Sequence, residues 1–546
     1  MRLVDRRIGL LFGLFLLLLL VGATRVTWLG TVRGEALREL AQAQQIEQLK
    51  VAARRGTISD RHGVELAVSQ DAVTVFANPF LIKDPVTVAG RIAPLLDKPL
   101  DEVTAALGDR QKGFVYLKRK LDIGRGEAIK KLRIEGIGTV VEPKRHYPQG
   151  PLASQLLGTV GIDNVGLSGL ERGHERLLHG SDDERRIVKD ALGKPISIVD
   201  VRRGRAGRDL QLTLDVAIQE RAEAVLGELG RVYQPKGATA LVLNPRSGEI
   251  LALANWPRVD ANDVASAPPY ARQNRAIEDS YEPGSTFKAF TVAGALEERL
   301  ITPRTRFSLP PTIQVADRVI KEAHARGGVT LTVEQILAQS SNIGSVKIGL
   351  LLGKKRFDRW VRRFGFGRAP GVGLPGEAGG IVPKPAEYSG SSLGNLPIGQ
   401  GLAVTPMQMA EGYSAIANNG LLRKPHILAS DRRRPERIIS GPTARRVARM
   451  LEGVLGPGGT AQEASVPGYK VAGKTGTAQK PDSQGGYSKD KYVASFIGFA
   501  PARRPRLLVA VMVDEPRGAY YGGVVAAPAF ERILSFALPY LRIPPS

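Results

Sequence analysis

Near the N-terminus, Ile8–Thr24 forms a run of seventeen residues without a charge, and three arginines precede it. In a bilayer, the backbone polar groups of a single segment can only be satisfied within a helix. The run is close to the short limit for a membrane span, which Arg25 extends by snorkelling. The basic flank keeps the N-terminus in the cytoplasm. We therefore expect a single-pass anchor in the cytoplasmic (inner) membrane over residues 8–28, a cytoplasmic segment 1–7, and the bulk of the chain outside.

A cleaved signal peptide is the alternative interpretation of this segment. Val21-Gly-Ala23 offers the small residues that a signal peptidase needs. The apolar run is nevertheless longer than the usual length of about 7–15 residues for a signal sequence. This difference favours an uncleaved anchor.

The composition indicates a folded chain of more than one domain. The length of 546 residues exceeds that of one hydrophobic core, and 43% hydrophobic residues are ordinary for a folded protein. The lack of cysteine excludes disulfides and thiol catalysis and suits export. The net charge of +24 is spread along the chain without a nucleic-acid-binding motif, so we expect no nucleic-acid partner. His174 and His179 are five residues apart, which puts them on different helical faces, and we expect no metal or cofactor.

Behind the anchor, the residue pattern divides the chain into a stalk and two folded regions. Residues 29–53 are polar with apolar residues at roughly helical spacing, which predicts a stalk helix. Residues 54–205 mix short alternating segments with turns, and we expect a non-catalytic α+β pedestal domain there. Residues 206–546 predict a sheet with helices packed on it. The expected strands are 209–215, two within 238–254, 471–480, 494–500 and 507–513, and the expected helices are 216–229, several within 330–420, and 529–538.

A serine at the start of an apolar helical pattern is the first candidate for chemistry. Ser285 follows Pro283 and Gly284, and the apolar spacing after it predicts a helix. Lys288 lies on the same helical face, and in a closed pocket its amine could lose its proton and act as the base for the serine. Alone, the motif is more typical of a capping serine followed by an ordinary exposed lysine. A second Ser-x-x-Lys occurs at Ser488–Lys491.

Two other motif matches lack the context that their chemistry requires. Gly468–Thr475 fits a phosphate-binding loop, but Pro481 and a Gly/Ser-rich segment follow where that loop needs a helix. Gly390–Gly394 fits the nucleophile elbow of α/β-hydrolases, but Pro397 blocks the expected helix. We regard both as chance matches.

Two short polar motifs follow Ser285 along the chain. Ser340-Ser-Asn342 comes after a helical stretch and can present a hydroxyl and a carboxamide from one turn. Lys474-Thr-Gly-Thr477 lies on a strand-like segment, where Gly476 lets another backbone approach. Each alone is typical of an ordinary helix end or edge strand. In this order, the three motifs are the set found in penicillin-binding proteins and serine β-lactamases, and the chain resembles that superfamily.

Segments outside these motifs resemble the class B penicillin-binding proteins in particular. The segments are Arg55–Gly63, Tyr147-Pro148, Gly166–Glu171, Thr405–Gln408 and Tyr521–Gly523. The chain departs from the family pattern at His62, where Asn is frequent, and at Ala289, where Pro is common. Among the subfamilies it is most similar to the division-specific (septal) transpeptidases, and the elongation-type enzymes are the alternative.

The resemblance implies an α+β multidomain fold. Its parts are the transmembrane helix, a dimerisation-type pedestal, and a transpeptidase domain with an antiparallel sheet sandwiched by helices. It also implies a substrate, the D-Ala-D-Ala end of a peptidoglycan stem peptide, and a ping-pong acyl transfer without cofactor or metal. β-Lactams are expected to acylate the same serine.

The resemblance assigns a role to each motif residue. Ser285 is the nucleophile and Lys288 its base. Ser340 relays a proton to the leaving D-Ala, and Asn342 orients the donor amide. The backbone amides of Ser285 and Thr477 form the oxyanion hole. The terminal carboxylate of the donor binds to the remaining motif residues, which are Lys474, Thr475, Gly476 and Thr477.

The resemblance also implies partners and leaves alternatives open. An amine of a second stem peptide is the acceptor, and a multispanning glycan polymerase and other division-complex membrane proteins are the expected partners. A D,D-carboxypeptidase, a β-lactam sensor and an inactive scaffold are the alternative functions. The short cytoplasmic segment 1–7 argues against the sensor.

Overall fold

The computed structural model describes residues 2–33, 46–189, 195–482 and 485–546. Contacts within the chain define two compact units whose segments alternate along the sequence. Unit 1 comprises residues 1–54, 71–144 and 179–207, and unit 2 comprises residues 55–70, 145–178 and 208–546. The contiguous division at residue 205 stays a prediction.

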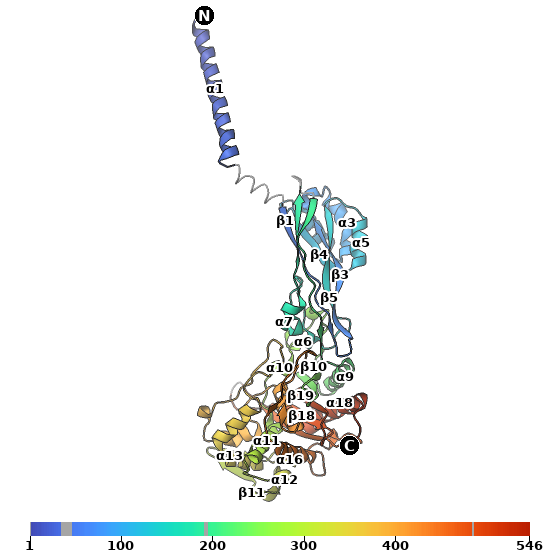
Figure 1. The fold of residues 1–546 in the computed structure, drawn as a ribbon, viewed down its shortest axis with the longest axis vertical. Coiled ribbons are helices and arrows are strands. Elements are labelled where there is room, and N and C mark those ends of the chain that lie inside the picture. Colours follow the sequence, from blue (N-terminus) through green and yellow to red (C-terminus); the bar gives the residue numbers. More distant parts are fainter. Residues whose placement is uncertain (1, 34–45, 190–194, 483–484) are drawn as a thin grey trace. The chain divides into compact units, whose positions relative to one another are not determined.

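The N-terminal helix α1 (Arg2–Thr31) covers the expected membrane span and extends beyond it at both ends (Figure 1). Its segment Arg6–Thr31 is long and apolar enough to cross a membrane. Near its C-terminal end, the guanidinium carbons of Arg25 and Arg33 lie 5.4 and 5.0 Å from the ring centroid of Trp28. An aromatic ring flanked by cations is typical of a membrane–water interface.

The prediction of a stalk helix over residues 29–53 is wrong at the C-terminal end of that range. Residues 46–51 form strand β1 (Ile46–Val51), which pairs antiparallel with β6 (Asp183–Lys189). β6 also pairs with β7 (Pro195–Arg202). The ladder satisfies the backbone groups of β1, so pairing with a distant segment overrides the local helical spacing. Residues 34–45 of the expected helix lie outside the described residues.

Unit 1 also contains a small α/β core. The second half of β3 (Glu65–Ala77) pairs with β4 (Val115–Leu121), and β5 (Ile137–His146) pairs with β3. Three helices pack apolar residues against this layer: α3 (Pro85–Leu96), α4 (Leu100–Gly108) and α5 (Ile123–Lys131). The α+β pedestal predicted from the mixed pattern therefore has a hydrophobic core of its own.

Unit 2 is organised around an antiparallel sheet of five strands in the order β10-β9-β19-β18-β17. The strands are β9 (Gly237–Leu243), β10 (Ile250–Trp256), β17 (Ala472–Pro481), β18 (Tyr487–Ala500) and β19 (Leu507–Asp514). β9 and β19 are buried along their whole length, so helices must cover both faces. This confirms the predicted sheet sandwiched by helices.

Two groups of helices cover the sheet (Figure 1). α9 (Val216–Tyr233) and α18 (Ala527–Tyr540) pack together against one face. The other group contains α11 (Lys288–Glu297), α12 (Val333–Ala338), α13 (Asn342–Arg363), α15 (Pro406–Ala417) and α16 (Gly441–Glu452). α11 and α13 belong to the group that supplies the functional residues described below.

The strand predicted over residues 209–215 is shorter in the structure. Only β8 (Leu210–Gln211) forms a strand, which pairs in parallel with β2 (Ile58–Ser59), and Leu212 makes an isolated antiparallel bridge to Leu428. Beyond it, Thr213 donates its backbone N–H to Ile427 O, and Asp215 caps α9 by accepting from Ile218 N. The alternating pattern of this segment therefore reflects side chains that are buried along an irregular segment, and it does not reflect a regular strand in a sheet.

Candidate active site

The predicted helix start at Ser285 is present, with a 3₁₀ turn as its first turn. Turn η4 (Gly284–Phe287) carries Ser285 and continues into α11. Gly284 has a φ of 53°, and its N–H donates to Gly399 O at 3.0 Å. The buried hydroxyl of Tyr413, on α15, donates to Thr286 O at 2.7 Å. These contacts hold the backbone on both sides of Ser285 in place.

Lys288 is fully buried one turn after Ser285. Its Nζ donates to Ser340 O and to Asn342 Oδ1, both at 2.6 Å, and lies 3.3 Å from Ser340 Oγ. Burial lowers the pKa of Lys288 to about 7; the carboxylate of Glu322 opposes this shift and the charge of Arg326 adds to it. Among the contacts of the described residues, no hydrogen bond joins this amine to Ser285.

Ser340 occupies a position where glycine is usual. It follows α12 with a φ of 59°, in the left-handed region. The N–H of Ser340 donates to Leu337 O, and the N–H of Ser341 donates to Ile336 O, which together make a Schellman motif. A non-glycine residue there costs about 1–2 kcal/mol. The bond from Lys288 to Ser340 O helps to offset this cost and holds the Ser340 hydroxyl at the cavity wall.

Asn342 begins α13 and has both ends of its carboxamide occupied. Its Oδ1 accepts from Lys288 Nζ, and its Nδ2 donates to Lys321 O at 2.9 Å. Its backbone N–H donates to Glu322 Oε2 at 2.6 Å. The segment that follows β13 (Arg318–Lys321) therefore fixes the orientation of this side chain.

The third motif lies on β17, as predicted. Lys474 is fully buried; burial lowers its pKa well below the usual value, and the charge of Lys288 lowers it further. Thr475 Oγ1 and Thr460 Oγ1 lie 2.8 Å apart, and Thr477 Oγ1 accepts from Gly522 N at 3.0 Å. The strand continues to Pro481, so the chain has no phosphate-binding loop at this point.

Gly476 is required by a close approach between β17 and the nucleophile turn. A Cβ atom at this position would lie 2.9 Å from Pro283 O and still closer to Ser495 Oγ. Such separations are far below van der Waals contact. The reason predicted from the sequence, an approach of another backbone, is confirmed.

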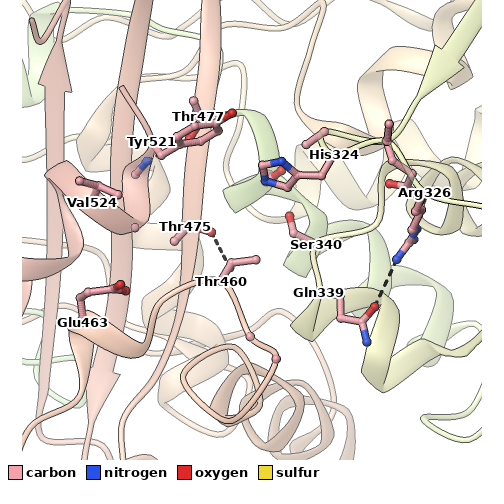
Figure 2. Close-up of a pocket in the computed structure, with 18 residues that line it drawn as sticks. His324, Arg326, Gln339, Ser340, Thr460, Glu463, Thr475, Thr477, Tyr521 and Val524 are labelled. Atoms are coloured by element: carbon pink, nitrogen blue, oxygen red, sulfur yellow. Dashed lines mark hydrogen bonds and ion pairs between the residues drawn. The ribbon is translucent and has the colours of Figure 1, made fainter. Parts of the chain in front are cut away.

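A cavity of about 520 Å³ joins the three motifs. Figure 2 shows Thr475 and Thr477 on one side and Ser340, His324 and Arg326 on the other. Ser285 also lines it. The buried Lys288, Lys474 and Gly476 and the partly exposed Asn342 are not among its lining residues. The structure thus brings together the predicted residues from three separate segments.

Some lining residues lay outside the predicted site. Glu322, His324 and Arg326 come from the segment between β13 and β14 (Val329–Thr332), whose polar sequence gives no sign of a function. Thr460 and Glu463 come from the loop after α16. Tyr521–Gly523 also lines the cavity, and this segment is one of those that resemble the class B family in sequence.

The second Ser-x-x-Lys motif lies on a strand and does not line the cavity. Ser488 lies on β18, and its Oγ donates to Asp490 Oδ1 at 2.7 Å. Within the described ranges, no group of three or more His, Asp or Glu side chains is arranged to hold a metal ion.

The family segments near the start of unit 2 meet in a buried ionic cluster. Glu171 Oε2 lies 2.8 Å from Arg55 Nη2, and Glu171 Oε1 lies 2.6 Å from Arg145 Nε. All three side chains are almost completely buried. Gly166 has no room for a side chain, because a Cβ atom there would collide with Glu171 O. These segments therefore stabilise the fold and lie outside the residues that line the cavity.

Comparisons with known proteins agree with the fold and the motifs. The family described as penicillin binding protein transpeptidase domain matches residues 238–535, and the penicillin-binding protein dimerisation domain matches residues 50–212. The chain therefore belongs to the penicillin-binding proteins with a dimerisation domain and a transpeptidase domain, the class B group.

Several known proteins are similar in sequence to this chain over nearly their whole length. The probable peptidoglycan D,D-transpeptidase PenA of Neisseria meningitidis is 35% identical over 530 residues, which are 96% of this chain and 90% of the relative. The peptidoglycan D,D-transpeptidase FtsI of Escherichia coli is 33% identical over 550 residues, 99% of this chain and 93% of the relative. A crystal structure of penicillin binding protein 3 from Mycobacterium tuberculosis with aztreonam is 28% identical, with a TM-score of 0.72, and covers 91% of this chain and 98% of its own.

Proposed function

We propose that the cavity is the active site of a peptidoglycan D,D-transpeptidase, with Ser285 as the acylated nucleophile. The transpeptidase activity follows from membership of the family and from relatives named for that reaction. The assignment of residues rests on one observation above all. A buried lysine with a pKa of about 7, Lys288, lies one turn from a serine that opens onto the cavity.

In the acylation half-reaction, neutral Lys288 takes the proton of the Ser285 hydroxyl. The serine oxygen attacks the carbonyl carbon of the penultimate D-Ala, and the backbone amides of Ser285 and Thr477 hold the resulting oxyanion. Each such donor is worth about 3–4 kcal/mol in acyl transfer. The C–N bond then breaks, and the leaving nitrogen of the terminal D-Ala takes a proton through Ser340 Oγ, which lies 3.3 Å from Lys288 Nζ.

In the second half-reaction, the amine of another stem peptide attacks the acyl-enzyme. It loses its proton to the same base, the new amide forms, and Ser285 regains its hydroxyl. Asn342 orients the donor amide, and Lys474, Thr475, Gly476 and Thr477 bind the terminal carboxylate. The threonine hydroxyls at the cavity wall support this assignment, as does the Lys474 amine, which lies 3.3 Å from Thr475 Oγ1. β-Lactams acylate the same serine.

We assign α1 as a single-pass anchor in the cytoplasmic membrane, with the N-terminus in the cytoplasm and both folded units outside. The arginines that precede the apolar run support this orientation. We further propose a septal role in cell division, with a multispanning glycan polymerase as the membrane partner. The alternative is a side-wall role, and imaging of a fluorescent fusion in dividing cells decides between the two.

Product analysis tests the proposed reaction. The full-length protein in detergent is incubated with a donor stem peptide ending in D-Ala-D-Ala and with an amine-bearing acceptor. We expect a cross-linked dimer and released D-Ala. A shortened monomer as the main product would identify a carboxypeptidase, and no product together with normal penicillin binding would indicate a scaffold.

A further inference from the structure

The carboxylate of Glu322 is surrounded by hydrogen-bond donors at the turn that carries Ser340 and Asn342. Its Oε1 accepts from Ser341 Oγ at 2.6 Å, and its Oε2 accepts from Asn342 N at 2.6 Å. Arg326 Nη2 lies 2.6 Å from the same Oε1. The side chain is only 6% exposed, although it directly follows β13 in a polar segment. These contacts hold the carboxylate of Glu322 against the turn that carries two of the proposed catalytic residues.

We propose that Glu322 is a positioning residue for acyl transfer: it fixes the Ser340–Asn342 turn and places a negative charge near the Lys288 amine. The inference rests on the proposed role of Lys288 as base. Two steps connect the two side chains. Asn342 donates its N–H to Glu322, and its Oδ1 accepts from Lys288 Nζ at 2.6 Å.

The first part of this role concerns geometry. Ser341 is the N-cap of α13, since its Oγ accepts from Gly344 N at 3.0 Å while donating its hydrogen to Glu322. The junction between α12 and α13 is therefore tied to Glu322 through a hydroxyl and a backbone amide. Because Ser340 precedes this tie in a left-handed conformation, loosening the tie would release the Ser340 hydroxyl from the cavity wall.

The second part concerns charge. Burial disfavours the ionised form of Glu322, but hydrogen bonds from Ser341 and Asn342 and the contact with Arg326 keep its pKa below the ordinary value. The resulting anion raises the pKa of Lys288, and Arg326 lowers it. Two other groups face the same region: Lys474 from β17, and His324, which lines the cavity.

The test measures the rate of acylation by a fluorescent penicillin, from pH 5.5 to 9, with the full-length protein in detergent. Glu322→Gln loses the charge and one of the two acceptor oxygens. Its rate at the high-pH plateau should fall about tenfold, the scale of a lost charge-assisted hydrogen bond. The midpoint of the rise should move to lower pH, because the neutral amine then persists to lower pH.

Arg326→Gln is the matched control of opposite sign. It removes a positive charge near Lys288 and leaves Glu322 without its cationic partner. Both changes favour the protonated amine of Lys288, so the midpoint should move to higher pH. Ser341→Ala removes one hydrogen bond without changing a charge; it should lower the plateau and leave the midpoint in place.

Unchanged midpoints in both charge variants would overturn the inference, as would a wild-type plateau in Glu322→Gln. If thermal melting finds Glu322→Gln unfolded, the shift in Arg326→Gln decides. Normal acylation by Lys288→Met would instead refute the proposed base, which separates the failure of the mechanism from the failure of this inference.

Discussion

Lys288 Nζ and Asn342 Oδ1 lie 2.6 Å apart, which ties the proposed base to the motif that follows it by 54 residues. This contact and the one to Ser340 O satisfy two of the three donors of an ammonium group. Full burial opposes the charge, and the balance leaves the pKa of Lys288 at about 7. The amine is therefore close to the ionisation balance at neutral pH, where a general base is most effective.

The nucleophile assignment predicts that Ser285→Ala abolishes covalent labelling by a fluorescent penicillin. The reason is that, among the residues that the structure describes, Ser285 alone combines a place in the cavity wall with the lysine of a Ser-x-x-Lys motif. Labelling is measured on a denaturing gel. Ser488→Ala is the matched control, because it changes the other Ser-x-x-Lys serine, which lies on β18 and hydrogen-bonds Asp490. Labelling that survives Ser285→Ala would refute the assignment.

The lowered pKa of Lys288 predicts that acylation rises with pH around a midpoint near 7. Below that pH the amine is protonated and has no lone pair for the serine proton. Lys288→Met should reduce the rate at least about 100-fold, the lower end of what a general base contributes, and should remove the rise. Time courses of penicillin acylation across the pH range measure both effects. A wild-type rate that is flat from pH 6 to 8 contradicts the assignment.

The buried ionic cluster predicts a strong dependence of stability on Glu171. Glu171→Gln leaves Arg145 buried without its anion and leaves Arg55 with Glu175 alone, and breaking such a buried pair typically costs about 3–5 kcal/mol. Thermal unfolding of the full-length protein should show a much lower midpoint. Glu228→Gln removes the partner of Arg532 in a half-exposed pair and should change the midpoint far less. Similar midpoints for the two variants would show that the cluster does not stabilise the fold.

The sequence predicted more of the site than of the units that carry it. The order of the three motifs was sufficient to predict that Ser285, Ser340 and Thr475 share one site, because the resemblance to a family with that motif set implies it, and all three line one cavity. Pairing between distant segments carries no such local signal. It turned residues 46–51 into a strand and interleaved the two units. Glu322 was missed for the same reason, since its role depends on a turn that lies twenty residues further along the chain.

A buried carboxyl on α15 predicts that stability falls as the pH rises. Glu411 is 2% exposed, and in the described part of the chain its Oε1 has no hydrogen-bond partner. Burial raises its pKa from the ordinary 4.5 to about 7, although Lys424 and Arg368 oppose the shift. The folded state therefore holds this proton more tightly than the unfolded chain does. The stabilisation is complete below about pH 4.5 and is lost as the pH rises to about 7, and its full size is about 3 kcal/mol.

Glu411→Gln removes this titration while keeping the shape of the side chain. The variant should match or exceed the wild type in stability at pH 8, and its free energy of unfolding should change less between pH 5 and 8. Denaturant unfolding at several pH values measures the difference. Glu334→Gln, at an exposed position on α12, should keep the wild-type dependence. Parallel pH profiles for Glu411→Gln and the wild type would mean that the carboxyl is ionised or hydrated in the folded protein, since only a buried proton links this residue to the slope.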